Sequence, residues 1–351
     1  MAHALALVLE RAREMRLREI DLPLVPGPDE LRIGIRTVGI CGSDLHYLQH
    51  GAIGPFVLRQ PMVLGHEASG VVLEVGSAVR GYAVGDRVCI EPGVPRLDSP
   101  AVLRGVYNLD PSVRFWATPP VHGCLTPEVV HPALFTHKLP DAVSFAEGAF
   151  VEPLAIGLQV ATKSRFKPGD VAVVLGAGTI GAMCTLAALA GGAAQVVLAD
   201  PVAPKLARFA QRRAVRTVEL PRESLADAVS QATGGWGADV VIEASGAAGA
   251  YAGISDLAGP GGCLVLVGMP ALPVPLDIVA LQAKELRVET VFRYANMFPR
   301  ALQLLASGQV DVRPFISRRF AFASAIEAFE QAALGLPQDL KIQIDMPGGA
   351  A

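Results

Sequence analysis

The sequence has almost no excess of charge of either sign. Its 351 residues carry 30 Lys and Arg against 33 Asp and Glu, and the basic residues are dispersed along the chain rather than clustered. A protein that binds nucleic acid or an anionic membrane surface usually presents a concentrated basic region. The composition therefore argues against both kinds of partner and favours a small-molecule ligand.

Cysteines are few, and none has a close partner in the sequence. The five lie at positions 41, 89, 124, 184 and 263, which is an odd number with no short spacing. This is not the pattern of a secreted disulfide framework. The first residues also lack a secretory signal, because Glu10 and Arg11 end a short apolar run. We therefore expect a reducing, cytoplasmic location.

Charge is missing altogether from residues 171–199, which is long enough to raise the question of a membrane span. Glycines divide this stretch into a β-branched piece, a piece rich in Ala and Leu, and a second β-branched piece. Strands that are covered on both faces of a parallel sheet are continuously apolar. The stretch therefore predicts strand, helix and strand in a buried layer rather than a membrane helix.

The pattern of elements divides the chain in two. A length of 351 residues is more than one hydrophobic core usually serves. Strand-like and helix-like segments alternate over residues 154–293, which predicts a doubly wound α/β domain. The first 150 residues hold short strand patterns broken by Gly and Pro, as in an antiparallel β domain. We expect one domain from residues 1–153 and 294–351, and another from residues 154–293.

A glycine-rich turn marks the start of the α/β domain. Residues 176–181 read Gly-Ala-Gly-Thr-Ile-Gly directly after a predicted strand. In that context Gly176 permits a tight turn, Gly178 lets the backbone approach a pyrophosphate, and Gly181 lets the helix pack on the strand. The turn therefore predicts a dinucleotide-binding site.

An acidic residue ends the second strand of this domain. Asp200 lies 24 residues after Gly176, where a carboxylate accepts hydrogen bonds from the adenine ribose and repels a 2′-phosphate. The alternative for Asp200 is a helix cap before Pro201. The arrangement favours NAD over NADP, although Lys205 could still contact the ribose edge and permit dual use.

Residue types suited to zinc occur in the first domain. A nicotinamide cofactor implies hydride transfer, which needs a group that polarises the substrate oxygen. Cys41, His66, Glu67 and Glu152 include the side chains that bind zinc, although a structural histidine and a buried cysteine are alternatives. Neighbours on a regular strand point apart. If His66 and Glu67 share one metal, the backbone must be irregular, and Gly65 could permit this.

Longer motifs connect the chain to a known family. The sequence resembles the zinc-dependent medium-chain dehydrogenase/reductase family, and in particular its polyol branch, the sorbitol and xylitol dehydrogenases. The resemblance covers nearly the whole chain. It implies a doubly wound parallel Rossmann domain that binds NAD, a mainly β, GroES-like catalytic domain, and a homo-oligomer, commonly a tetramer. The motifs, in family order and spacing, are GICGSDLHY, PMVLGHEASGVVLEVG, GDRVCIEPGVP, FWATPPVHG, FVEPLAIGLQ, VLGAGTIG and VFRYAN.

The resemblance also implies roles for individual residues. Cys41, His66 and Glu67 ligate one catalytic zinc, and Glu152 holds the zinc-bound water or exchanges with Glu67. Ser43 accepts the alcohol proton and His46 passes it to solvent; a turn serine and a surface histidine are the alternatives. The other implied positions are Tyr47, Phe115, Arg293 and Tyr294 for substrate, and Ile180, Val267, Gly268, Met269 and Phe292 for cofactor.

Residues 94–111 form a long segment without a helical or strand period. In most relatives this lobe carries four cysteines around a structural zinc, and the aligned positions here are Arg96, Ser99, Val102 and Asp110. None of these supplies a thiolate, so we predict no structural zinc and one zinc per chain. We expect the lobe to be ordered by packing of its apolar residues, which are Leu97, Leu103, Val106, Tyr107 and Leu109.

Taken together, the residues and the family resemblance imply a zinc-dependent enzyme that oxidises a polyol to a ketose with NAD, reversibly, in the manner of a D-xylulose reductase or L-iditol 2-dehydrogenase. Three alternatives remain open. The first is a threonine or simple secondary-alcohol dehydrogenase of the same family. The second is a metal-free quinone reductase of the same fold, and the third is a nucleotide-binding protein without turnover.

Overall fold

The structure, a computed structural model, describes residues 2–347, which form two compact units. Unit 1 comprises the residues up to Glu152, the segment Phe298–Ala306 and the residues from Ile316 onward. Unit 2 comprises Pro153–Met297 and the short segment Ser307–Phe315. Unit 1 is therefore built from three segments of the chain and unit 2 from two.

Unit 2 is built on a six-stranded parallel sheet with the strand order β15-β14-β13-β16-β17-β18. This is the order of a doubly wound Rossmann sheet, in which the chain starts at the centre and builds outward in both directions. The predicted α/β architecture is therefore confirmed. The strands are β13 Val171–Leu175, β14 Gln195–Asp200, β15 Val215–Glu219, β16 Ala238–Glu243, β17 Ala258–Leu266 and β18 Arg287–Thr290.

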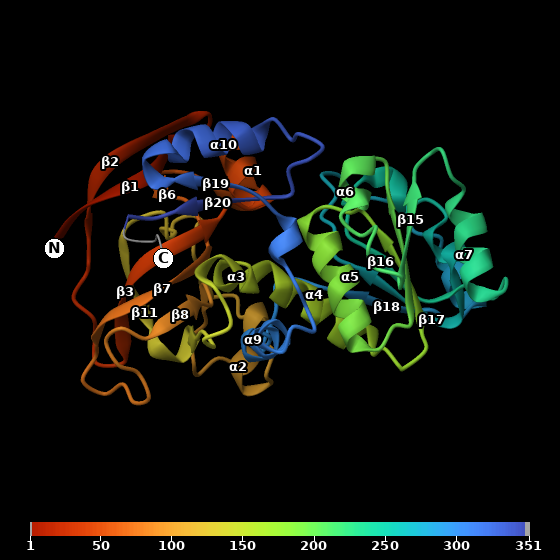
Figure 1. Cartoon of the computed structure of the whole chain (residues 1–351), viewed down its shortest axis with the longest axis horizontal. Helices are drawn as coiled ribbons and strands as arrows, with labels where there is room; N and C mark the ends of the chain where they lie inside the picture. The colour runs from red at the N-terminus through yellow and green to blue at the C-terminus, as the bar shows by residue number, and fades with distance from the viewer. Residues whose placement is uncertain (1, 348–351) are drawn as a thin grey trace. The chain divides into compact units, whose positions relative to one another are not determined.

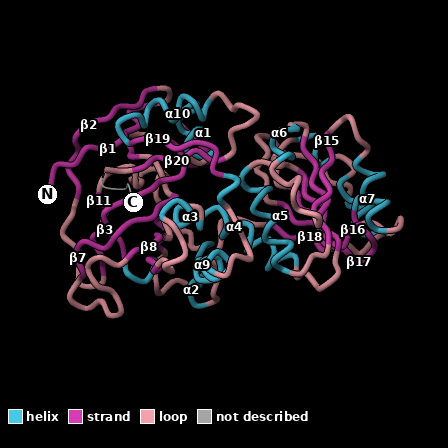
Figure 2. Tube along the Cα trace, viewed as in Figure 1, coloured by secondary structure: helices cyan, strands magenta, loops and turns pink. Residues whose placement is uncertain are grey.

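Helices cover both faces of this sheet, with α5 and α7 on opposite sides (Figure 2). The uncharged residues 171–199 form β13, α5 and β14, and most residues of β13 and α5 are buried. Within residues 2–347, no helix combines the length and apolar character that a bilayer crossing requires. The helices of this unit are α4 Val151–Ser164, α5 Thr179–Gly191, α6 Ala203–Ala207, α7 Leu225–Thr233 and α8 Ile278–Ala283.

Unit 1 is mainly β. Its seven-stranded sheet has the order β12-β8-β7-β3-β20-β19, with β11 also paired to β3, and a smaller sheet has the order β2-β1-β6. The last strand, β20, pairs antiparallel with β3 (Figure 1), so residues 343–345 lie beside residues 37–39. The main-sheet strands are β3 Glu30–Gly39, β7 Glu67–Val75, β8 Arg87–Ile90, β11 Glu128–Pro132, β12 Thr136–Lys138, β19 Ile316–Ala321 and β20 Lys341–Asp345.

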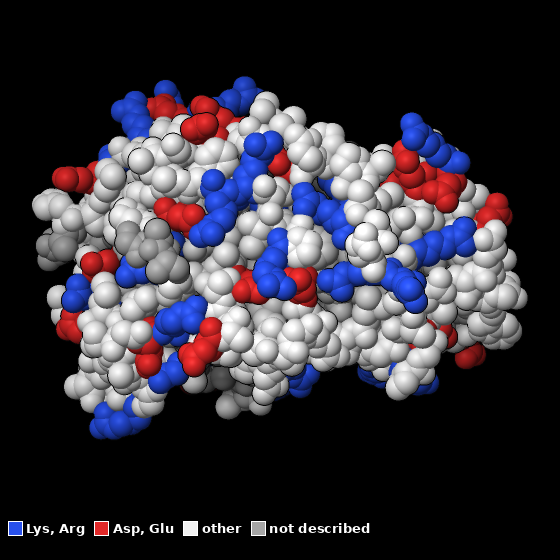
Figure 3. All heavy atoms as spheres, viewed as in Figure 1, with Lys and Arg blue, Asp and Glu red and all other residues white. Residues whose placement is uncertain are grey.

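The remaining elements of unit 1 are shorter or lie at its edges. The other strands are β1 Ala2–Arg11, β2 Glu14–Leu22, β4 Ala52–Ile53, β5 Phe56–Val57, β6 Met62–Val63, β9 Gly93–Val94 and β10 Arg114–Phe115. The helices are α1 Gly42–His50, α2 Pro100–Leu103, α3 Phe145–Ala149, α9 Phe298–Ala306 and α10 Ala325–Ala333. Acidic and basic side chains are interspersed with uncharged surface on the face shown in Figure 3, as the balanced composition predicts.

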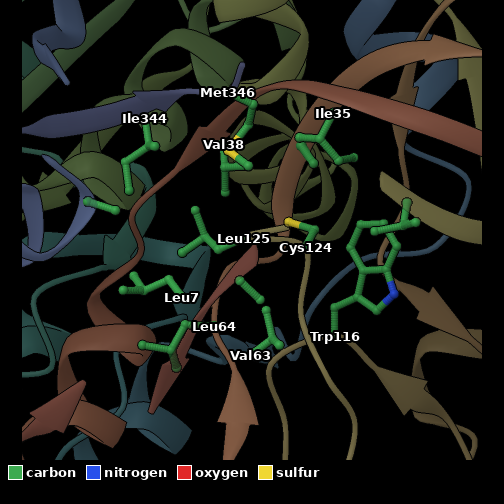
Figure 4. Close-up of a cluster of buried hydrophobic side chains, with 14 of the residues drawn as sticks. Leu7, Ile35, Val38, Val63, Leu64, Trp116, Cys124, Leu125, Ile344 and Met346 are labelled. Atoms are coloured by element: carbon green, nitrogen blue, oxygen red, sulfur yellow. The ribbon is translucent and has the colours of Figure 1, made fainter. Parts of the chain in front are cut away.

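The core of unit 1 joins segments that are far apart in the sequence. Figure 4 shows Leu7 of β1, Val38 of β3, Leu125 and Ile344 of β20 gathered in one apolar cluster, and each of these side chains is fully buried. Cys124 lies in the same cluster, and all five cysteines are free thiols. This packing fixes β3, β20 and the start of β7 as one rigid frame.

The lobe at residues 94–111 differs from the prediction. It contains the short helix α2 and a 3-10 turn at Tyr107–Leu109, but its apolar residues point outward. Leu103 is 79% exposed and Leu97 57%, and Val106 and Leu109 are also exposed. The expectation of an apolar staple is therefore wrong, because the lobe offers these side chains no core to pack into.

Buried polar groups hold the lobe instead. Asp110 is 4% exposed, and its carboxylate accepts hydrogen bonds from the backbone N–H of Arg96 at 2.6 Å and of Ser112 at 2.9 Å. Tyr107 donates a hydrogen bond of 2.5 Å to the buried Glu91 carboxylate, at the base of the lobe. Hydrogen bonds to a carboxylate are stronger than neutral ones, so these few contacts are enough to order a short loop.

Candidate metal and cofactor sites

Three of the four predicted metal-binding residues meet in unit 1. One ligand atom each of Cys41, His66 and Glu67 can be chosen so that all lie within 4.8 Å of one another. Cys41 follows β3 as the N-cap residue of α1, His66 precedes β7, and Glu67 is the first residue of β7. Both His66 and Glu67 are buried. The site is therefore formed where two neighbouring strands of the main sheet begin or end.

A glycine makes this convergence possible. Gly65 has φ +88°, in the left-handed region, so the chain enters β7 with the irregular backbone that neighbouring ligands require. A Cβ atom at Gly65 would lie 2.9 Å from Leu125 and 3.0 Å from Val38. Gly39 on the paired strand is equally constrained, because a Cβ atom there would lie 2.0 Å from Glu67 Oε2. The carboxylate of Glu67 thus occupies space that only glycine leaves open.

Asp44, which the sequence analysis did not select, supports two of these residues. Its buried carboxylate accepts hydrogen bonds of 3.1 Å from the backbone N–H of Cys41 and of Gly65, and Oδ1 lies 3.6 Å from His66 Nδ1. Metal-binding histidines commonly direct their second nitrogen to such a carboxylate. The capping pattern of an acid three residues after the N-cap could have identified it.

Charge interactions in this group outweigh the cost of burial. Burial raises the pKa of Asp44, but the neighbouring His66 and the two backbone N–H groups lower it by more. The net pKa lies below the ordinary value, so the carboxyl stays ionised. Burial likewise lowers the pKa of His66, but Asp44 and Cys41 bring it to well above its usual value. The pocket therefore favours positive charge at its centre.

A buried lysine from the end of the chain completes the group. Lys341 Nζ lies 2.7 Å and 2.8 Å from the two carboxylate oxygens of Glu67 and 2.9 Å from the carbonyl oxygen of Ile40. Its pKa is lowered by burial, but Glu67 and Cys41 raise it to above the ordinary value. No local pattern indicates this contact, because 274 positions separate Lys341 from Glu67.

The donor set fits a zinc ion. A thiolate, an imidazole and a carboxylate are the side chains that zinc prefers, and three protein ligands leave one position for substrate. Each carboxylate oxygen of Glu67 has a second lone pair beyond the one that Lys341 uses. Glu152, at the start of α4, is buried and interacts electrostatically with Lys341, but it does not belong to the three-residue cluster.

The predicted proton-relay and substrate residues of unit 1 lie on or near α1. Ser43 is partly buried in the first turn of this helix, two residues from Cys41. His46 is exposed, and its Nδ1 lies 2.9 Å from the carbonyl oxygen of Ala52, so Nδ1 carries the proton and Nε2 can accept one. Tyr47 is buried, and the ring of Phe115 lies 5.7 Å from the ring of His66.

In unit 2 the three glycines have the geometry that a dinucleotide site requires. Gly176 has φ +101°, and a Cβ atom at Gly181 would lie 1.8 Å from the carbonyl oxygen of Gly176. A Cβ atom at Gly178 would meet nothing within 4 Å. The first and third glycines are therefore needed by the protein itself, whereas the second borders open space that a pyrophosphate can approach.

Asp200 connects this turn to the sheet. Its Oδ2 accepts a hydrogen bond of 2.7 Å from the backbone N–H of Ala177, and Oδ1 accepts one of 2.8 Å from Val202. It does not cap α6, whose N-cap residue is Val202. Both oxygens keep lone pairs for ribose hydroxyls. Asp200 therefore has a structural role in the turn, and its role toward the adenine ribose stays a prediction.

The other predicted residues of unit 2 follow the carboxyl ends of the strands. Arg293 has φ +58° and its guanidinium lies 4.9 Å from the ring centre of Phe292, whereas Tyr294 is buried. Glu243, a fully buried residue that the sequence analysis missed, binds the N–H groups of Ser245 and Gly246 through its carboxylate. Of the remaining residues, Ile180 is the second residue of α5, Lys205 lies on α6, Val267 and Gly268 follow β17, and Met269 is exposed.

Comparison with known proteins identifies relatives over the whole chain. The family model described as the alcohol dehydrogenase GroES-like domain matches residues 27–141, and that described as zinc-binding dehydrogenase matches residues 179–307. The chain is 54% identical to a D-xylulose reductase of Morganella morganii over 93% of this chain and 97% of that protein. It is 42% identical to the sorbitol dehydrogenase of Bos taurus, over 97% of this chain and 96% of that protein.

A solved structure agrees with these matches. The crystal structure of an oxidoreductase/dehydrogenase of unknown specificity from Escherichia coli superposes with a TM-score of 0.93 at 35% identity, covering 98% of this chain and 99% of that one. Both the GroES-like part and the Rossmann part of the fold are thus shared. The chain belongs to the zinc-dependent medium-chain dehydrogenase/reductase family.

Proposed function

We propose that this protein catalyses the reversible oxidation of a secondary alcohol in a polyol to the corresponding ketose, with NAD as the hydride acceptor. The observation that carries the proposal is the buried cluster of Cys41, His66 and Glu67, a donor set suited to one catalytic zinc. The choice of a polyol is supported by the names of the relatives, D-xylulose reductase and sorbitol dehydrogenase.

The residues of unit 1 would divide the chemistry as follows. A zinc ion held by the cluster supplies Lewis-acid polarisation of the substrate oxygen. Ser43 accepts the proton of the substrate hydroxyl as it gives up its own, and His46 takes that proton on Nε2 and passes it to solvent. Nε2 is available for this because Nδ1 donates to the carbonyl oxygen of Ala52. Glu152 holds water or exchanges as a ligand. Tyr47 and Phe115 are the substrate residues proposed for unit 1, and Arg293 and Tyr294 are those proposed for unit 2.

The cofactor is NAD in this proposal. The open space at Gly178 accommodates the pyrophosphate, and the carboxylate of Asp200 receives the ribose hydroxyls and disfavours a 2′-phosphate. Lys205 offers the chain limited use of NADP. The remaining predicted contacts to the cofactor are Gly176, Ile180, Gly181, Val267, Gly268, Met269 and Phe292.

One zinc per chain and no structural zinc are further parts of the proposal. Asp110 uses its carboxylate for backbone N–H groups within the lobe, and Arg96 and Val102 are not zinc ligands. We also propose a cytoplasmic homo-oligomer, a tetramer by family resemblance. The five free thiols agree with a reducing compartment.

A substrate panel tests the proposal. Initial rates with xylitol, sorbitol, galactitol, ribitol and threonine, each with NAD and with NADP, should show the highest kcat/KM for a polyol with NAD. A preference for threonine or a simple alcohol would replace the substrate class but keep the zinc chemistry. Activity that survives removal of zinc by a chelator would instead favour a metal-free reductase and overturn the proposal.

A further inference from the structure

A buried lysine contacts the cluster of Cys41, His66 and Glu67, and no role assigned above explains its charge. Lys341 is 2% exposed, and an ammonium has three N–H donors. All three have partners, namely the two oxygens of Glu67 and the carbonyl oxygen of Ile40, at distances between 2.7 Å and 2.9 Å. The lysine is thus held in one position by Ile40, which directly precedes Cys41, and by Glu67 at the start of β7.

Burial of this lysine requires a reason beyond packing. Lysine is almost never fully buried without a partner, because its charge loses its hydration. Lys341 lies on β20, the strand that pairs with β3 and brings the ammonium to the metal-binding end of that sheet. A methionine or leucine would fill the same position at lower cost if only packing mattered. The position therefore uses the positive charge.

The effect of that charge depends on the metal. Without a metal ion, the ammonium balances the carboxylate of Glu67 and keeps it directed at Cys41 and His66. With a metal ion bound, two positive groups share one carboxylate, and they repel each other in an interior that screens charge poorly. The same side chain thus stabilises the empty cluster and weakens the filled one.

We propose that Lys341 is a positioning residue that holds Glu67 ready for zinc and then competes with zinc for it, so that Glu67 remains an exchangeable ligand. The inference deepens the proposed function and rests on its zinc site. A carboxylate that can leave the metal gives substrate a position there. Such an open position separates a catalytic zinc from a structural one.

Metal binding tests this directly, without reference to catalysis. Zinc is removed with a chelator, and the dissociation constant is measured by competition with a chromogenic chelator for wild type, Lys341→Met and Lys341→Arg. Lys341→Met should bind zinc at least tenfold more tightly than wild type, while its metal-free form melts at a lower temperature. Lys341→Arg keeps the charge and should retain zinc affinity near that of wild type.

Two further variants show whether the effect passes through Glu67. Glu67→Gln removes the shared carboxylate, so adding Lys341→Met to it should change zinc affinity much less than the same change does in wild type. Lys284→Met is the matched control, because Lys284 also donates to three backbone oxygens, those of Ser255, Asp256 and Ala258, but in unit 2 and without a carboxylate. It should leave zinc affinity unchanged.

The outcomes distinguish this inference from the proposed function. If wild type binds no zinc, the proposed function fails. If wild type binds zinc and Lys341→Met binds it equally or less tightly, only the role of Lys341 is overturned. Should Lys341→Met fold only when zinc is present, the rate of zinc release to the chelator replaces the equilibrium measurement, and a rate equal to that of wild type or faster would overturn the inference.

Discussion

The two units place their functional residues in different ways. In unit 2 the glycine turn and Asp200 lie within 25 positions on consecutive elements of a regular parallel sheet, which is the general arrangement of dinucleotide sites. In unit 1 the cluster combines Cys41, His66 and Glu67 with Lys341 from the last strand, and it needs an irregular backbone at Gly65. A local motif thus serves cofactor binding, whereas the metal chemistry depends on long-range packing.

The largest expected effect comes from removing the thiolate of the metal cluster. Cys41→Ser should lose tightly bound zinc and lower kcat/KM by roughly 10³-fold or more, because Lewis-acid polarisation contributes several kcal/mol to the transition state. Metal analysis and initial rates measure both quantities. Cys184→Ala is the control, since burial raises the pKa of Cys184 to about 12 and its thiol stays neutral within unit 2. A Cys41→Ser enzyme with wild-type zinc and activity would contradict the account.

A glycine pair tests the dependence of unit 1 on backbone shape. Gly65 and Gly81 both have left-handed φ values, +88° and +83°, but only Gly65 lacks room for a Cβ atom. Gly65→Ala should cost roughly 3 kcal/mol or more of unfolding free energy from strain plus overlap, and Gly81→Ala about 1 kcal/mol from strain alone. Denaturant unfolding measures the difference. Equal losses would show that the close contacts to Leu125 and Val38 relax freely.

An aspartate pair tests the local site of unit 2. Asp200→Ala should raise the dissociation constant of NADH roughly 10- to 100-fold, because a charge-assisted contact contributes about 1.5 to 3 kcal/mol. Its preference for NAD over NADP should also decrease. Asp239→Ala is the control, since Asp239 also accepts a backbone N–H, from Val171, but at the opposite end of β13. Fluorescence titration with NADH measures both, and similar losses in the two variants would refute a specific role for Asp200.

The smallest effect concerns the lobe at residues 94–111. Asp110→Asn weakens the hydrogen bonds to Arg96 and Ser112, and should cost about 1 to 2 kcal/mol of local stability. Trypsin should then cleave faster after Arg104. Asp98→Asn is the control, because Asp98 is exposed and makes only a surface ion pair with Arg96. Cleavage at the wild-type rate in Asp110→Asn would mean that other contacts order the lobe.

The sequence alone predicts the parts of the structure that depend on local patterns. The uncharged stretch with its glycines predicts β13, α5 and β14, because parallel strands and their crossover helix have a distinctive composition. Cys41, His66 and Glu67 were candidates by residue type, and family resemblance selected them. The structure shows how Gly65 lets two neighbours contribute to one cluster.

The contacts that were missed depend on tertiary structure. Lys341 reaches Glu67 only because β20 pairs with β3, and no local pattern encodes a pairing across 300 positions. The lobe was predicted to pack through its apolar residues, but four of those five side chains are exposed because the short loop has no core for them. Hydrogen bonds to the buried Asp110 carboxylate hold it instead. Burial of a polar side chain is harder to infer from sequence than burial of an apolar one.

X-ray absorption spectroscopy of the zinc-loaded protein tests the central claim most directly. The account predicts one zinc per chain with a single sulfur ligand at about 2.3 Å and nitrogen or oxygen ligands at about 2.0 to 2.2 Å. A spectrum with two or more sulfur ligands, or with none, would contradict a single ion held by Cys41, His66 and Glu67.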